Sequence, residues 1–397
     1  MGPSVSELQS RTARRVQHLR AEGAYHVLEQ AQALEAAGRD ILHLEVGEPD
    51  FLAADPVREA GIEALRTGRA RYVPPGGLGA LRQAIAETAG RQRGLTFTPS
   101  QVLVSPGAKP NMFFPTLALI EPGDEVIYPD PGFPTYPAMI GVAGGVGVAV
   151  PVREARGFSF DLEALERALT PRTRMIILNS PANPTGGVIP PADLEAIAEA
   201  AERVDAWILS DEIYTRITFQ GEVAPSIASL PGMADRTIIV DGFSKTYAMS
   251  GWRLGFGIMP EPLARRVELL LTHAFGSTAE FTQWAAVEAL TGSQAWVRQM
   301  VEAYRKRRDR MVARLNAIPG ITCGEPQGAF YVFPNVTSLG IPVEELADRI
   351  LRQAGVALLP GTAFGDNGEG YLRLSYATSM EKLDAALERI EAFVRGL

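Results

Sequence analysis

Short apolar segments alternate with stretches of helical spacing between residues 101 and 243. The apolar segments read QVLVS, DEVIYPD, GVAV, RMIILNS, DAWILSD and TIIVDGF. Short apolar runs bounded by turn residues predict buried strands. Strands that alternate with helices predict an α/β fold, a mainly parallel sheet with helices on both faces. In such a sheet, ligands bind at the carboxyl ends of the strands.

The chain before this region predicts mainly helices. Residues 7–38 show helical spacing with a break at 23–26, and Gly38 is a plausible stop. The segment ILHLEVGEPDF, 41–51, predicts a short strand that runs into a turn. Helices are predicted over 56–68 and directly after the Pro-Pro-Gly-Gly turn within 69–90.

The chain after this region predicts one long helix and a second lobe. The helix covers 291–317, with apolar residues repeating at helical spacing. Residues 320–397 read as α+β, with strands in GAFYVF, VALLPGTAFG and YLRLSYA, a helix over 343–354 and a last amphipathic helix. Arg373 alternates with apolar neighbours in a strand, so it either faces solvent or points inward, where its fork suits a carboxylate.

Composition and charge exclude several classes of function. The chain has 397 residues, of which 46% are hydrophobic, which is ordinary for a globular protein of two or three lobes. A net charge of −8 argues against nucleic acid as a partner. The basic run at 305–308 lies within the long predicted helix, so we expect it to form a solvated face.

Cysteine and histidine content excludes further chemistry. The single cysteine, Cys323, excludes an internal disulfide and a cysteine-rich metal site. The four histidines form no pair at ligand spacing, so no metal is expected. No apolar run has transmembrane length and no signal-peptide pattern is present, so we expect a cytoplasmic protein without a membrane partner.

A lysine follows the last strand of the alternating region. Ser244 and Lys245 come after the apolar run at 238–240, and Arg253 stands eight residues further on. The lysine could be a solvated surface charge, but its aromatic and apolar neighbours argue against that reading. A desolvated lysine keeps its amine uncharged and nucleophilic, and such lysines form Schiff bases with carbonyl compounds, pyridoxal phosphate above all. The nearby hydroxyl and guanidinium suit a phosphate.

Four other strand ends carry residues that suit the same cofactor. Gly107 lies in a glycine turn that opens a helix, which suits phosphate. Phe133 could stack on a flat ring or pack the core, and Asn183 lies in a tight turn while offering an amide donor. Asp211 closes an apolar strand and needs a partner such as a protonated pyridine nitrogen. Each residue alone has a simpler structural reading, but all the strand ends agree on one cofactor.

The motifs GEPDF, Y-x-P-P-x-G, NPTG, DEIY, SK…GWRLG and YLRLSYA occur in order across roughly residues 30–385. In these motifs the chain closely resembles the class I, fold-type I, pyridoxal-phosphate-dependent aminotransferases, in particular the aspartate-aminotransferase-like bacterial subgroup. The resemblance implies a large cofactor-binding domain over 47–290 and a smaller α+β domain over 291–397. It also implies that residues 1–46 associate with the small domain, and that the protein is a homodimer with shared active sites.

The resemblance assigns catalytic and ring-binding roles residue by residue. Lys245 would form the Schiff base and act as general base and acid in a ping-pong exchange between an amino acid and a 2-oxo acid. Asp211 would pair with the pyridine nitrogen. Asn183 and Tyr214 would hydrogen-bond the phenolic oxygen, and Phe133 would stack on the ring.

The remaining assignments concern the phosphate and the substrate carboxylate. The phosphate ligands implied by the resemblance are Ser244, Arg253 and the amides around Gly107, Ala108 and Lys109, with Tyr72 reaching the site of the neighbouring subunit. Arg373 and the Gly47 backbone would hold the α-carboxylate of the substrate, and Asn183 is a further substrate-binding residue that the resemblance implies.

The substrate side chain is the least determined part of the prediction. In the resembled subgroup, a lysine at the position of Lys109 helps to bind a distal carboxylate, which favours aspartate and glutamate. Residues 272–281 contain no arginine that could do this instead. Because Pro110 departs from the usual pattern and Tyr25 and His26 are further candidates for the pocket, aromatic and other neutral amino acids stay open.

Two other classes of function share this fold. Pyridoxal-phosphate-dependent C–S lyases and synthases use the same site, and turnover that depends on a 2-oxo acid would separate transfer from elimination. A cofactor-sensing domain of a transcription factor is the non-enzymatic alternative. The roughly 40 residues before GEPDF leave little room for the DNA-binding module that such a protein needs.

Overall fold

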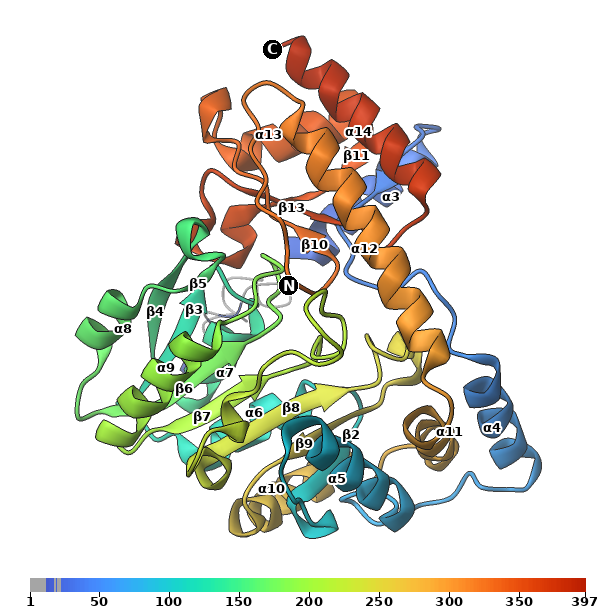
Figure 1. Cartoon of the computed structure of the whole chain (residues 1–397), viewed down its shortest axis with the longest axis vertical. Helices are drawn as coiled ribbons and strands as arrows, with labels where there is room; N and C mark the ends of the chain where they lie inside the picture. Colours follow the sequence, from blue (N-terminus) through green and yellow to red (C-terminus); the bar gives the residue numbers. More distant parts are fainter. Residues whose placement is uncertain (1–11, 18, 20–22) are drawn as a thin grey trace, which may run out of the picture.

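An eight-stranded sheet forms the centre of the protein in a computed structural model that describes residues 12–17, 19 and 23–397 (Figure 1). The strand order is β2-β9-β8-β7-β6-β3-β4-β5. The bounds are β2 Val102–Ser105, β3 Glu125–Asp130, β4 Val146–Arg153, β5 Ser159–Phe160, β6 Thr173–Asn179, β7 Trp207–Asp211, β8 Thr237–Gly242 and β9 Gly255–Ile258. Strands β4, β3, β6, β7 and β8 pair in parallel, while β9, β2 and β5 are antiparallel to their neighbours. The predicted mainly parallel α/β sheet is therefore confirmed; β5 and β9 are additional strands.

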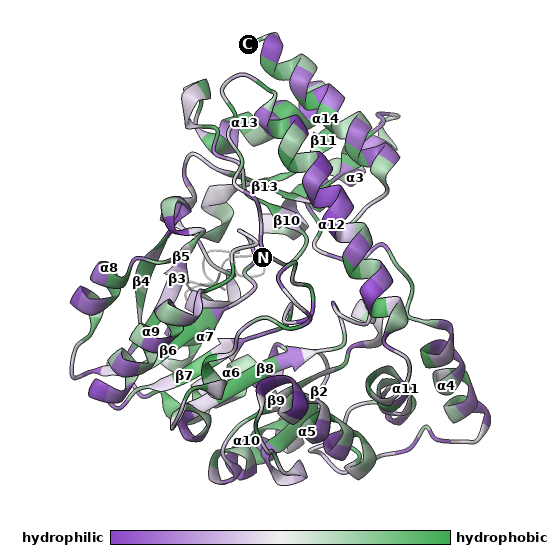
Figure 2. Ribbon diagram, viewed as in Figure 1, coloured by the Kyte–Doolittle hydropathy of each residue, from purple (hydrophilic) through white to green (hydrophobic). Residues whose placement is uncertain are grey.

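The apolar strands are buried on both faces, which explains their nearly continuous hydrophobic sequences. In β6, Met175 and Ile177 pack against residues of α6, α7 and α10, whereas Ile176 and Leu178 pack against α8 and α9. Successive side chains of a strand point to opposite faces, so one strand serves two cores. Figure 2 shows hydrophobic residues along strands of this sheet, such as β4 and β8.

The helices of the sheet lobe follow the strands or precede the sheet. Their bounds are α4 Asp55–Arg66, α5 Gly79–Arg93, α6 Pro110–Leu119, α7 Thr135–Ala143, α8 Leu162–Ala168, α9 Pro191–Arg203, α10 Glu261–Phe275 and α11 Glu280–Thr291. Helices α5 and α11 pack against β2 and β9 through a third apolar cluster that includes Leu81, Ile85 and Ala285. Among the described residues, no helix is long and apolar enough to cross a lipid bilayer.

Helix α12, Ala295–Asn316, runs from the sheet lobe to a C-terminal lobe (Figure 1). This lobe holds a three-stranded antiparallel sheet, β10 Tyr331–Val332, β13 Leu372–Ser375 and β12 Leu359–Pro360, with α13 Val343–Arg349 and α14 Met380–Arg395. Strand β1, Leu42–His43, pairs in parallel with β11, Val356–Ala357. Helix α3, Gly23–Ala36, contacts the same lobe through Ala31 and Val27, and α2 covers Arg14–Gln17.

Three local predictions are wrong. The predicted break at 23–26 is the first turn of α3, and the earliest part of the helix predicted over 7–38 lies outside the described residues. The helix predicted over 291–317 begins at Ala295, after a separate helix α11. The basic run is not a solvated face, because Arg308 is only 5% exposed and donates to the carbonyl of Pro326.

Candidate active site

The carboxyl ends of β6, β7 and β8 meet the turn that follows β1. Asn179 ends β6 and lies opposite Asp211 at the end of β7, and Asp211 lies opposite Val240 of β8. Lys245 follows β8 directly. Because parallel strands end at one edge of the sheet, residues far apart in sequence converge here.

The amine of Lys245 is placed in a low-dielectric site. Its Nζ donates a hydrogen bond to the carbonyl oxygen of Gly47 at 2.5 Å and lies 5.8 Å from the ring centre of Phe330. The pKa of Lys245 is lowered to about 8, mainly by burial; Glu48 opposes the shift, and the cations of Arg373, Arg253 and Lys109 contribute to it. Roughly a tenth of the amine is therefore uncharged at pH 7, far more than for an ordinary lysine, and this form is able to attack a carbonyl carbon.

The carboxylate of Asp211 is buried at the floor of the site. It is 4% exposed and accepts a 2.7 Å hydrogen bond from the hydroxyl of Tyr136 and a 3.3 Å bond from the amide of Ile213. Burial raises the pKa of Asp211 to about 6, although these two hydrogen bonds oppose the shift. A buried carboxylate of this kind is stabilised by a cationic partner, and a protonated ring nitrogen would be one.

Arg373 points inward, which decides between the two orientations left open by the sequence. The side chain is 3% exposed, and its guanidinium lies between the rings of Tyr331 and Phe364, at 4.6 and 5.0 Å from their centres. It donates to the Oδ1 atom of Asn183 at 3.1 Å and to the carbonyl oxygen of Glu45. The two rings and two acceptors fix the plane of the guanidinium, as two-bond recognition of a carboxylate requires.

Gly107 and Arg253 form a cradle at the start of α6. Gly107 has a φ of 85°, and a Cβ atom there would stand 2.3 Å from Nη2 of Arg253. A Cβ atom on Gly255 would stand 2.4 Å from the amide nitrogen of Ala108. Backbone amides at a helix start and an arginine are thus brought together at a distance that only glycine permits, which suits a phosphate.

Phe133 and Lys109 stand on another side of the site. Phe133 packs edge-on against Tyr136, the partner of Asp211, with 5.8 Å between ring centres. Nζ of Lys109 lies 5.1 Å from the centre of the Phe133 ring. Of the other predicted residues, Ser244 directly precedes Lys245 in the turn after β8, and Tyr214 lies near Lys245, with 6.0 Å from the amine to its ring centre.

Tyr72 is a predicted site residue that the fold of one chain does not bring in. Its surface is 98% exposed.

Three residues of the site had no role in the sequence prediction. Tyr136 holds Asp211, Asn179 accepts a hydrogen bond from the amide of Asn183 at 2.8 Å, and the hydroxyl of Tyr331 lies 2.8 Å from that of Tyr214. The signal for Tyr136 was available, since a buried acid at a strand end requires a donor and neighbouring βα turns are the nearest source. Tyr331 comes from the other lobe, and no local pattern reveals that contact.

The residues present fit pyridoxal phosphate. The reactive amine, the buried carboxylate and the phosphate cradle belong to the ends of β8, β7 and β2 respectively, and the aromatic ring of Phe133 stands beside them. Each of the chemically distinct parts of that cofactor, its aldehyde, ring nitrogen, ring face and phosphate, has a complementary group here.

Comparison with known proteins agrees with this site. The family described as aminotransferase class I and II matches residues 39–390. An aspartate aminotransferase of Geobacillus stearothermophilus is 39% identical over 97% of this chain and 99% of its own length. An aspartate/prephenate aminotransferase of Cereibacter sphaeroides is 40% identical over 94% of this chain and 95% of its own.

Comparison of the fold with solved structures agrees with the sequence comparison. A solved structure of the Thermus thermophilus aspartate aminotransferase with maleate superposes with a TM-score of 0.92, at 40% identity, covering 97% of this chain and 99% of that one. With the site described above, these similarities show that the chain belongs to the aminotransferase class I and II family and is a pyridoxal-phosphate-dependent aminotransferase.

Proposed function

We propose that this aminotransferase takes acidic amino acids, aspartate or glutamate, and passes the amino group to a 2-oxo acid. The observation that carries the proposal is the set of cations around the amine of Lys245, namely Arg373, Arg253 and Lys109. A phosphate and an α-carboxylate account for two of them. The third suits a second carboxylate, which acidic amino acids have and neutral ones lack.

Each predicted residue has a task in that reaction. Bound pyridoxal phosphate supplies an electron sink for the negative charge that develops on the substrate α-carbon. Lys245 takes the α-proton and returns it at the other end of the exchange, as a general base and then acid. Asp211 keeps a proton on the ring nitrogen by pairing with it.

The other residues orient rather than transfer protons. Arg373 and the backbone of Gly47 hold the α-carboxylate, while Asn183 and Tyr214 donate toward the ring oxygen and Phe133 covers the ring face. The proposed phosphate ligands are Ser244, Arg253, Tyr72 of a second subunit and the backbone amides of Gly107, Ala108 and Lys109.

The names of the relatives support an acidic substrate. Two are aspartate or aspartate/prephenate aminotransferases, and the solved structure holds maleate, a dicarboxylate. An aromatic or other neutral amino donor is the alternative, and the Lys109 experiment below separates the two. The proposed division into residues 1–46, 47–290 and 291–397, like the cytoplasmic location, rests on the sequence.

Lys109→Ala is expected to weaken turnover of aspartate and glutamate selectively. A lost charged contact to a carboxylate costs about 1.5–3 kcal/mol, so kcat/KM should fall about 10- to 150-fold. Alanine and phenylalanine have no distal carboxylate, so their kcat/KM should change little. The backbone amide of residue 109 is retained, which keeps the phosphate cradle intact.

Steady-state kinetics with four amino donors measure this difference. Lys109→Arg keeps the charge and should retain the preference, while Lys306→Ala removes an exposed lysine of α12 and serves as the matched control. An equal loss for acidic and neutral donors would rule out the acidic-substrate proposal.

We also propose a symmetric homodimer in which Tyr72 completes the site of its partner. A hollow of about 730 Å³ opens beside the phosphate cradle and is lined by Arg253, Pro106, Thr278 and Leu52, whose apolar side chain is 71% exposed. A loop of a second chain that carries Tyr72 would fill such a hollow and shield Leu52. A closed dimer of this kind uses one self-complementary surface.

Mixed dimers of two impaired variants are expected to restore one native site. Lys245→Ala chains carry an intact Tyr72, and Tyr72→Phe chains carry an intact Lys245. If Tyr72 acts across the interface, one site of the hybrid takes Lys245 from one chain and Tyr72 from the other, while its second site has both defects. Titration of pyridoxal phosphate after mixing and refolding should then show wild-type affinity at the one native site of each hybrid. Affinity that stays at the Tyr72→Phe level at every mixing ratio would show that Tyr72 acts within its own chain.

A further inference from the structure

Tyr331 is a buried tyrosine at the boundary of the two lobes that the proposed function leaves without a task. It belongs to β10 and is 1% exposed. Its hydroxyl lies 2.8 Å from the hydroxyl of Tyr214, and the guanidinium of Arg373 lies 4.6 Å above its ring. A Cβ atom on Gly47 would stand 2.0 Å from the Tyr331 hydroxyl oxygen. One side chain thus contacts three residues predicted to bind cofactor or substrate.

The segment before Tyr331 is fixed to the loops that carry Asn183 and Tyr214. The amides of Gln327 and Gly328 both donate to the carbonyl of Gly186, at 2.9 and 3.0 Å, three residues after Asn183. The amide of Ala329 donates to the carbonyl of Ile217 at 2.8 Å, three residues after Tyr214. Ala329 holds a φ of 55°, a conformation that is uncommon without glycine.

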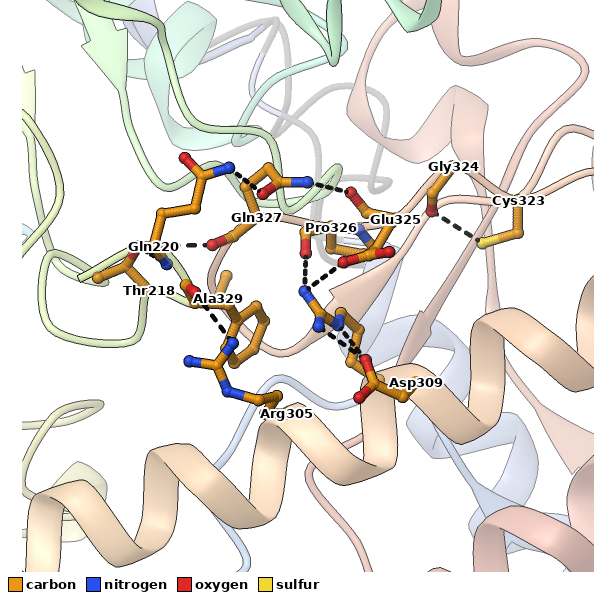
Figure 3. A network of polar contacts seen from close by, with 12 residues as sticks. Thr218, Gln220, Arg305, Asp309, Cys323, Gly324, Glu325, Pro326, Gln327 and Ala329 are labelled. Atoms are coloured by element: carbon orange, nitrogen blue, oxygen red, sulfur yellow. Dashed lines mark hydrogen bonds and ion pairs between the residues drawn. The ribbon is translucent and has the colours of Figure 1, made fainter. Parts of the chain in front are cut away.

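Side chains of helix α12 also contact this segment (Figure 3). Arg308 donates to the carbonyl of Pro326 at 3.0 Å and pairs with Glu325 at 3.0 Å. Arg305 donates to the carbonyl of Phe219 at 3.0 Å, and the amide of Phe219 donates to the carbonyl of Gln327 at 2.9 Å. The arginines of the basic run therefore fix the approach of Tyr331 to the site.

The hydrogen bond between the two phenols has a defined direction once Tyr214 binds the cofactor. Burial raises the pKa of both phenols above 10, so each keeps its single proton at neutral pH. The ring oxygen of the bound cofactor would carry negative charge and would accept a hydrogen bond from the hydroxyl of Tyr214. When Tyr214 donates to it, the proton between the two phenols must come from Tyr331.

We propose that Tyr331 is a positioning residue that donates to the phenol oxygen of Tyr214 and thereby strengthens its contact with the ring oxygen of pyridoxal phosphate. This inference rests on the proposed role of Tyr214. Chains of hydrogen bonds polarise one another in a low-dielectric site, so a donor to Tyr214 makes Tyr214 a better donor. The packing of Arg373 on the same ring joins the carboxylate site to the ring-oxygen site.

The test is a pH titration of the visible absorption of the cofactor-loaded enzyme. The absorption changes when the proton shared by the ring oxygen and the lysine nitrogen is lost. A strong donor to the ring oxygen stabilises its negative charge and lowers the pH of that change. Tyr331→Phe keeps the ring under Arg373 but removes the donor, so the midpoint should rise by about half a pH unit or more.

A double-mutant cycle separates this role from a general packing effect. Tyr214→Phe should raise the midpoint further than Tyr331→Phe, and adding Tyr331→Phe to it should cause no additional rise. Gly47→Ala, which pushes on the Tyr331 hydroxyl, should reproduce the direction of the Tyr331→Phe shift. An unchanged midpoint in Tyr331→Phe, or an equal rise with and without the Tyr214 hydroxyl, would overturn the proposal.

The control is Tyr376→Phe, which removes another fully buried hydroxyl of the same aromatic cluster, one that donates to the carbonyl of Ala329 at 3.2 Å. Its midpoint should match that of the wild type. If the proposed contact of Tyr214 with the ring oxygen is wrong, the result is different. Tyr214→Phe would then leave the midpoint unchanged even though the wild-type enzyme binds the cofactor.

Discussion

Lys245→Ala is expected to abolish transamination, with kcat falling by at least about 10²- to 10⁴-fold, the range for a lost general acid–base catalyst. The amine of Lys245 is the basic group of the site. It donates a hydrogen bond to the carbonyl of Gly47 and lies near the cations of Arg373, Arg253 and Lys109. The variant also loses the covalent bond to the cofactor. Stopped-flow kinetics and the visible spectrum measure both losses.

A small primary amine added to the Lys245→Ala enzyme should restore part of the activity, since it replaces the missing base in the space left by the side chain. Borohydride reduction of the wild-type enzyme followed by peptide mapping should label Lys245. Labelling of a different lysine would contradict the assignment.

The same lysine has a pH signature. Because the pKa of Lys245 is lowered to about 8, the uncharged fraction of the amine rises through one half near pH 8 and levels off about one to two pH units above that value. The rate at which cofactor-free enzyme captures pyridoxal phosphate should follow that fraction. An ordinary lysine, with a pKa near 10.4, would keep gaining rate well above pH 8.

The candidate residues whose meeting at this edge of the sheet follows from the sequence are those that follow strands. Asp211 and Lys245 directly follow or end apolar runs, so a parallel sheet brings them together wherever the helices lie. The orientation of Arg373 could not be predicted, because strand periodicity allows both faces. Its burial depends on Tyr331 and Phe364, which flank it from other strands and loops.

Local sequence patterns do not predict the contacts between the two lobes. The basic run of α12 reads as a solvated face, yet Arg308 is buried because the segment 325–330 lies against it and supplies the carbonyl of Pro326 and the carboxylate of Glu325 as partners. The same long-range packing brings Tyr331 to Tyr214, 117 residues away in sequence. Strand β9 was missed because its glycines, Gly255 and Gly257, resemble a turn, although their lack of side chains allows β9 to pack closely against Ala108 and Asn111.

Asp211→Asn is expected to lower kcat by about 150- to 5,000-fold. Removing one partner of a buried ion pair costs about 3–5 kcal/mol, and here the other partner is the protonated ring nitrogen that the carboxylate is proposed to hold. The asparagine oxygen can still accept the hydrogen bond from Tyr136, so the variant removes the charge while it keeps the shape. Single-turnover kinetics with a saturating amino acid isolate this step from binding.

Asp241→Asn is the matched control. Asp241 is the last residue but one of the neighbouring strand β8 and is also buried. Burial raises its pKa to about 7, so it is partly protonated at neutral pH and the amide mimics its neutral form. Its replacement should change kcat far less. Equal losses in the two variants would contradict the pairing of Asp211 with the ring nitrogen.

The pH dependence of cofactor binding gives an independent reading of the same charge. The pKa of Asp211 in the site is raised to about 6, so its ionised form predominates above pH 6 and is lost as the pH falls through that value. Wild-type affinity for pyridoxal phosphate, measured by equilibrium titration, should therefore weaken below pH 6 through Asp211. That component should be missing in Asp211→Asn, whose affinity is low on both sides of pH 6.

A cofactor analogue with a methylated, permanently cationic ring nitrogen needs no carboxylate to keep its charge, so it should restore part of the lost kcat in Asp211→Asn. If the analogue restored nothing, the carboxylate would have to act on the enzyme in some way other than through the charge of the ring.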